Sequence, residues 1–103
     1  MVKWSKPAKL DLTQIHDYIA RDSKFYAKKV SIEIVEKSEI LNSFPEIGRI
    51  VPEIEDLNIK ELLIYSYRLI YEVFPNKVDV LALIHSKRNF IKDFLNQRRH
   101  EKS

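Results

Sequence analysis

The sequence contains no cysteine, which excludes disulfide bridges and thiolate metal sites. No run approaches the roughly 18 apolar residues that a membrane-spanning helix needs. The opening residues, MVKWSKPAKLDL, lack the apolar segment of a signal peptide, so we expect a cytoplasmic protein without a membrane partner. Carboxylates and histidines do not cluster at metal-ligand spacing, and we therefore expect neither a metal ion nor another cofactor.

The residues that are present fit one small globular domain. Hydrophobic residues make up 45% of the 103 residues and charged residues 32%, which is typical of a folded chain rather than a disordered one. A chain of this size supports one core, so we expect a single domain over residues 1–103, with residues 98–103 as a flexible tail. The formal net charge of +3 permits an acidic partner, either nucleic acid or protein, without requiring one.

Two amphipathic helices are expected in the first half of the chain. A short strand over residues 2–5 precedes Pro7, which suits the first turn of a helix. Apolar residues then recur at helical spacing as far as Asp22. Either Asp22 or Ser23 can cap a second helix over residues 24–43. The short turn between the two predicts an antiparallel helical hairpin.

The second half reads as a loop followed by strands. Gly48 is the only glycine, and it marks either a positive φ angle or a close approach of the backbone. Strands are expected over residues 59–65, 67–74 and 78–85, because β-branched and aromatic residues dominate there. A last helix over residues 89–100 would place Phe90 and Phe94 on its apolar side.

These elements predict an α+β fold with the order β-α-α-β-β-β(-α). The helical hairpin must bury its apolar side, so it covers one face of a small, mainly antiparallel sheet. We expect the other face to be open, at least in part. Alternating residues of the middle strand are predicted to lie in the core, namely Tyr67, Leu69, Tyr71 and Val73.

The chain resembles toxins of the RelE/ParE superfamily of bacterial type II toxin–antitoxin systems. The resemblance covers nearly the whole chain, and its segments are VKWSKPAKLDLTQIHDYIA, FPEIGRIVPE, KELLIYSYRLIYEV and VLALIHSKRNF. It implies the same small sheet backed by a helical hairpin. It also implies a cognate antitoxin that wraps the toxin, and hence a hetero-oligomer.

The superfamily divides by target, because RelE-like members cut messenger RNA in the ribosome and ParE-like members poison DNA gyrase. RelE-like nucleases carry lysines on the strand before the YR strand, where this chain has Ile59 and Glu61. Their C-terminal tyrosine falls at Phe94, which has no proton to exchange. The long hairpin, the PEIGRIVPE loop and the IHSKRNF segment resemble ParE-like members. We therefore expect a gyrase inhibitor; the alternatives are a metal-independent messenger endoribonuclease and an inactive or repurposed relative.

The candidate site residues follow from the resemblance. Arg68 and Arg88 match the arginines of RelE-like nucleases, and His85 has a side chain suited to acid–base chemistry. A nuclease would use Arg68, His85 and Arg88 as catalytic residues. In either class we expect Lys60, Arg68, Lys87 and Arg88 to bind the target. A basic RNA-binding module is a weaker hypothesis, because the sequence shows neither a glycine-rich loop nor an exposed aromatic stacking pattern.

Structural explanations compete with these assignments. Arg68 can pair with Glu61 or Glu72 across the sheet, and His85 can simply end a strand. Lys87 and Arg88 can belong to a solvated turn, and Trp4 to the core or to an antitoxin contact.

The register of the last hairpin decides which residues share a face. If Pro75 and Asn76 alone form the turn, Glu72 pairs with Asp79, and His85 shares the face of Arg68. A longer turn that includes Lys77 would move His85 to the other face.

Overall fold

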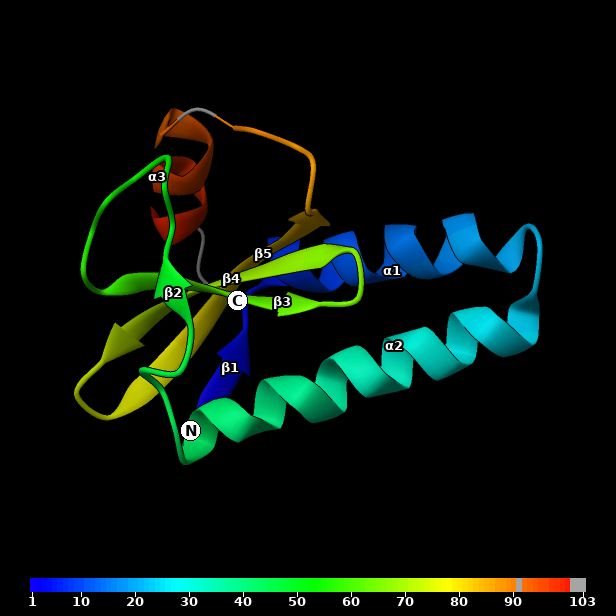
Figure 1. Ribbon diagram of the computed structural model, residues 1–103, viewed down its shortest axis with the longest axis horizontal. Coiled ribbons are helices and arrows are strands. Elements are labelled where there is room, and N and C mark those ends of the chain that lie inside the picture. The colour runs from blue at the N-terminus through cyan, green and yellow to red at the C-terminus, as the bar shows by residue number, and fades with distance from the viewer. Residues whose placement is uncertain (91, 101–103) are drawn as a thin grey trace.

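The computed structural model describes residues 1–90 and 92–100, which form a five-stranded sheet with helices (Figure 1). The elements in chain order are β1 (Val2–Trp4), α1 (Lys6–Ala20), α2 (Lys24–Ser38), the 3-10 helix η1 (Glu39–Asn42), β2 (Arg49–Ile50), β3 (Ile59–Ile64), β4 (Tyr67–Phe74), β5 (Lys77–His85) and α3 (Lys92–His100). The strands lie in the order β1-β5-β4-β3-β2. Only β1 and β5 pair in parallel, so the sheet is mainly antiparallel, as predicted.

The two long helices begin at serine caps. The side chain of Ser5 accepts a hydrogen bond from the backbone N–H of Ala8 at 3.2 Å, and Ser23 accepts one from Tyr26 at 3.0 Å. The α-helical part of the second helix ends at Ser38, earlier than expected, and the chain continues as η1. Within the described part of the chain, no helix is both long enough and apolar enough to cross a membrane.

The helical hairpin packs on one face of the sheet and forms the larger core. Ala8 of α1 and Ile34 of α2 are buried against Leu69 and Tyr71 of β4, which confirms the predicted inward-facing side of that strand. Trp4 packs at the edge of this core, and its indole N–H donates to the hydroxyl of Ser38 at 3.3 Å. The apolar stripes of both helices are thus covered by the sheet.

The opposite face of the sheet is covered over much of its area, so it is open only in part, at positions such as Leu63 of β3, which is 50% exposed. A second core joins Val51, Ile59 and Ile84 to Leu95 of α3. Helix α3 and the segment of residues 51–58 supply this cover, and Figure 1 shows α3 apart from the hairpin.

Two arginines of α3 hold the helix against the rest of the domain. Arg98 donates to both carboxylate oxygens of Asp11 on α1, at 2.8 and 3.1 Å. Arg99 donates to both oxygens of Glu72 on β4, at 3.1 and 2.7 Å. Residues 98–100, expected in a flexible tail, therefore belong to a docked helix, while residues 101–103 lie outside the described residues.

Gly48 lies where the backbone comes close to β4 and β3. A Cβ atom at this position would stand 2.5 Å from the hydroxyl oxygen of Tyr71 and 2.6 Å from the carbonyl oxygen of Glu61. The N–H of Gly48 donates to the same Tyr71 hydroxyl at 2.9 Å. Its φ angle is not positive, so the glycine serves close approach, one of its two predicted roles.

Candidate functional site

Arg68 and His85 lie on opposite faces of the sheet. The turn consists of Pro75 and Asn76, and Glu72 pairs with Asp79, which is the first of the two expected registers. However, the register shifts further along, because Ile70 pairs with Ala82 while Tyr71 pairs with Val80.

The residue between these partners, Leu81, is extra and forms a β-bulge. Leu81 and Ala82 consequently both belong to the core on the α3 side. Beyond the bulge, Arg68 pairs with Ile84 and Tyr67 pairs with His85. The expectation that this turn places Arg68 and His85 on one face is therefore wrong.

Arg68 lies in a buried network of ion pairs. Only 4% of the Arg68 surface is exposed to solvent. Its Nη1 and Nη2 atoms donate to the two carboxylate oxygens of Glu53, at 2.8 and 2.7 Å. Its Nε atom donates to Oε1 of Glu61 at 2.7 Å, so the predicted pairing with Glu61 is present. A third acceptor, the carbonyl oxygen of Arg88, lies 3.0 Å from Nη1.

Both carboxylates of this network accept hydrogen bonds from arginines. Glu61 is buried, and its Oε2 atom accepts a hydrogen bond of 2.6 Å from Arg49 of β2. The hydrogen bonds from Arg68 lower the pKa of the Glu53 carboxyl below its usual range, and those from Glu53 raise the pKa of Arg68. The negative charges of Glu53 and Glu61 thus balance the positive charges of Arg49 and Arg68. Burial disfavours a charged carboxylate, and the neighbouring guanidinium groups offset that cost.

Apolar residues cover the Arg68 network from the side of α3. The Arg68 guanidinium carbon lies 5.2 Å from the ring centroid of Phe90, which is a cation–π contact. The rings of Phe90 and Phe94 pack against each other with centroids 5.6 Å apart. Phe94, aligned with the nuclease tyrosine, contacts Arg88 and Arg98 through cation–π interactions.

The basic corner after β5 differs from this network because it faces solvent. His85, Lys87 and Arg88 are all exposed. Nδ1 of His85 lies 3.2 Å from the N–H of Lys87, which donates to it, and the His85 ring packs edge-on against Tyr67. The structure therefore groups three of the predicted residues and leaves Arg68 behind them, bonded to the backbone of Arg88.

Lys60 lies away from this corner. It pairs with Tyr71 across β3 and β4, so it shares the hairpin face, whereas Ile59 and Glu61 share the face of Arg68. Its Nζ atom stands 3.4 Å from a carboxylate oxygen of Glu46. The four expected target-binding residues thus do not form one surface.

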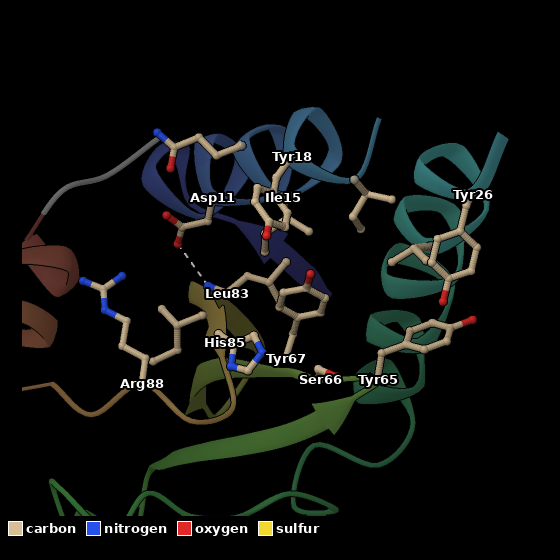
Figure 2. Close-up of a pocket in the computed structure, with 14 residues that line it drawn as sticks. Asp11, Ile15, Tyr18, Tyr26, Tyr65, Ser66, Tyr67, Leu83, His85 and Arg88 are labelled. Carbon is tan, nitrogen blue, oxygen red and sulfur yellow. Dashed lines mark hydrogen bonds between the residues drawn. The ribbon is translucent and has the colours of Figure 1, made fainter. Parts of the chain in front are cut away.

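A groove of about 590 Å³ opens between the helical hairpin and the ends of β4 and β5 (Figure 2). Figure 2 shows Tyr18 of α1 and Tyr26 of α2 on two sides of this groove, with Tyr67 between them. His85 and Arg88 line its other end. We call this feature the tyrosine groove; Tyr65 also lines it.

Sequence reasoning missed the tyrosine groove and the role of Glu53. The tyrosines are scattered over the chain, and their only local signal is that Tyr18 and Tyr26 flank the expected turn of the helical hairpin. Glu53 lies in a loop 15 positions from Arg68, and no spacing rule links two such residues.

The family model described as "ParE toxin of type II toxin-antitoxin system, parDE" matches residues 2–90 of the chain. The chain belongs to the ParE toxin family. Among individual relatives, Toxin RelE2 of Caulobacter vibrioides is 28% identical over 88 residues, which cover 84% of this chain and 96% of that protein.

A solved structure supports the fold of this ParE-family chain. It is titled "Chromosomal ParDE TA system from P. aeruginosa", and a chain in it superposes with a TM-score of 0.71 at 22% identity. The match covers 84% of this chain and 95% of that chain. The sheet and hairpin are therefore those of the RelE/ParE toxins, as the sequence resemblance implied.

This ParE-family toxin presents two chemically different surfaces. The Arg68 face is a closed set of ion pairs under α3, whereas the tyrosine groove and its basic corner are open. Within residues 1–90 and 92–100, no group of three or more histidine or acidic side chains is placed to hold a metal ion. Ring stacking and binding of anions are the interactions that the open surface offers.

Proposed function

We propose that this toxin is a ParE-like growth inhibitor that acts on DNA gyrase in the cytoplasm and is neutralised by a cognate antitoxin. Family membership implies the antitoxin partner and hence a hetero-oligomer. The observation that carries the choice of target is the state of Arg68, whose guanidinium is already bonded to Glu53, Glu61 and the Arg88 carbonyl.

A phosphate-binding role for Arg68 is difficult in this arrangement. A messenger phosphate would have to displace the Glu53 carboxylate and approach within reach of the buried Glu61 carboxylate. Both carboxylates repel an anion, and α3 limits access from outside. A catalytic role that needs Arg68 to stabilise a growing phosphate charge is therefore disfavoured.

The basic corner supplies the residues that we assign to target binding. Lys87 and Arg88 are exposed, and neither forms an ion pair with a described residue. Arg68 supports them indirectly, because it bonds the carbonyl oxygen of Arg88 and fixes the backbone of the corner. Lys60 remains a weaker candidate, since Glu46 already neutralises it.

A metal-independent, RelE-like endoribonuclease is the second candidate function. It is favoured by the relative named Toxin RelE2 and by the exposure of His85 beside Arg88. Such an enzyme would use His85 as acid or base and Arg88 for the phosphate, without direct help from Arg68.

Controlled expression of the chain in bacteria tests the proposal. We expect arrested growth with DNA breaks and intact messages, and rescue by the antitoxin encoded in an adjacent reading frame. The variant K87A/R88A should lose the arrest, whereas K28A/K29A, which removes two exposed lysines from α2, should keep it. Cleaved messages with unbroken DNA would favour the endoribonuclease instead.

A further inference from the structure

We propose that the tyrosine groove binds a nucleotide, with its base against the tyrosine rings and its phosphate beside Arg88 and His85. The proposal goes beyond gyrase inhibition and does not depend on it. It concerns the hairpin side of the sheet, whereas Arg68 lies on the α3 side.

The walls of the groove provide flat aromatic surface that is accessible to a ligand. Tyr18 is 69% exposed and Tyr26 is 48% exposed, although both line the groove. Ile15 and Val30 line it as well and supply apolar contacts. Every base has a π-face, so stacking on such rings tolerates any sequence. The volume of about 590 Å³ lies within the usual range for small-molecule sites.

The charge distribution favours an anionic ligand. Asp11 is an acidic residue of the lining, but its carboxylate accepts two hydrogen bonds from Arg98 and one from the N–H of Leu83. Its charge is therefore compensated within the protein. The Arg88 guanidinium, in contrast, lies 5.4 Å from the ring centroid of Phe94 and forms no ion pair with a described residue. A cation remains available at the end of an aromatic groove, which matches the layout of a nucleotide.

Binding of a fluorescein-labelled 12-nucleotide oligothymidylate to the purified full-length chain, followed by fluorescence anisotropy, tests this site. Y18A/Y26A should weaken binding by about tenfold or more, because each lost stacking contact costs at least several-fold. Y18F/Y26F keeps both rings and should retain the affinity of the wild type. F25A is the matched control, because Phe25 is 81% exposed on α2 but does not line the groove.

A second pair of variants tests the phosphate contact. R88Q should weaken binding and reduce its dependence on salt, whereas K87Q, one position away and outside the groove lining, should have a smaller effect. Circular dichroism of each variant excludes loss of fold as the cause. Unlabelled thymidine monophosphate then separates the two sources of the ligand. Competition by the monophosphate would identify a free nucleotide as sufficient, and competition by the oligonucleotide alone would identify a strand.

Three results would overturn the proposal. The first is an absence of saturable oligonucleotide binding. The second is binding that Y18A/Y26A and R88Q leave unchanged, which would locate it on another basic surface. The third is tyrosine-dependent binding of an acidic peptide without any binding of the oligonucleotide. None of these measurements uses gyrase. A negative result would therefore reject the nucleotide site without bearing on the proposed inhibition of gyrase.

Discussion

Arg68 and Glu53 are joined by two parallel hydrogen bonds, from Nη1 to Oε2 at 2.8 Å and from Nη2 to Oε1 at 2.7 Å. This pair connects β4 to the segment of residues 51–58, which covers the sheet on the side of α3. A bidentate pair of this kind fixes geometry as well as energy. Arg68, which a nuclease of the superfamily would use as a catalytic residue, is thus held in a buried ion pair between two segments of the fold.

Replacing Glu61 with alanine should lower the free energy of unfolding by about 1–3 kcal/mol, the cost of a buried donor left without an acceptor. The reason is that Arg68 donates from its buried Nε atom to Glu61, and only its Nη atoms keep their bonds to Glu53 and the Arg88 carbonyl when Glu61 is lost. Urea unfolding followed by circular dichroism measures the change.

The matched control for this prediction is E46A, which removes the exposed partner of Lys60. A surface pair of this kind contributes under about 1 kcal/mol. Equal losses for E61A and E46A would show that the buried network contributes no more than an ordinary surface contact.

The contribution of Glu53 to stability should depend on pH. Arg68 lowers the pKa of Glu53 in the folded state, so the stabilisation is complete above the unfolded value, near 4.5, and is lost as the pH falls through the folded value. E53Q should therefore cost about 1–3 kcal/mol at neutral pH and less under acidic conditions.

Unfolding curves of wild type and E53Q over a range of pH measure this difference. E55Q serves as the control, because Glu55 is exposed in the same segment and forms no ion pair with a described residue. A cost of E53Q that stays constant down to pH values well below 4.5 would contradict the assignment.

Gly48→Ala should destabilise the fold by about 1–3 kcal/mol through crowding. The new Cβ would meet both the Tyr71 hydroxyl and the Glu61 carbonyl oxygen. Because the carbonyl belongs to the backbone, Y71F should relieve only part of the clash. Thermal unfolding of G48A, Y71F and the double variant measures this, and a full rescue of G48A by Y71F would contradict the backbone contact.

Tyr65 should ionise at a higher pH than an ordinary tyrosine. Its hydroxyl donates to the Glu33 carboxylate on α2, and this hydrogen bond raises the pKa of Tyr65 to about 12. The difference in phenolate absorbance between wild type and Y65F during alkaline titration isolates this group. E33Q should return the pKa toward 10, whereas E36Q, on an exposed position of α2, should not change it.

Most of the fold could be predicted because its signals are local. Helical spacing, the capping serines and the strand residues lie within a few positions of each other. The reversal at Pro75 and Asn76 was also predicted, and the observed pairing of Glu72 with Asp79 is one of the two registers that the sequence left open. The bulge at Leu81 was not predicted, because an extra residue in a run of apolar residues leaves no local mark. That one residue moved His85 away from Arg68.

The candidate site was harder to predict because it depends on contacts between distant segments. Adjacent strands offered Glu61 and Glu72 as alternative partners of Arg68, and Glu61 is the one that the structure shows. The pairing with Glu53, in contrast, depends on the path of a loop. Likewise, the sequence predicted Arg98 and Arg99 in a solvated tail, because their partners Asp11 and Glu72 lie far away in the chain.

Incubation of the purified chain with gyrase and supercoiled plasmid, in parallel with programmed ribosomes and messenger RNA, tests the central claim most directly. The account predicts that cleaved plasmid accumulates in a gyrase-dependent manner. It also predicts that the messenger RNA stays intact, because Arg68 is held by two carboxylates and is not available to a phosphate. Cleavage of the messenger RNA on the ribosome, with no effect on the gyrase reaction, would contradict it.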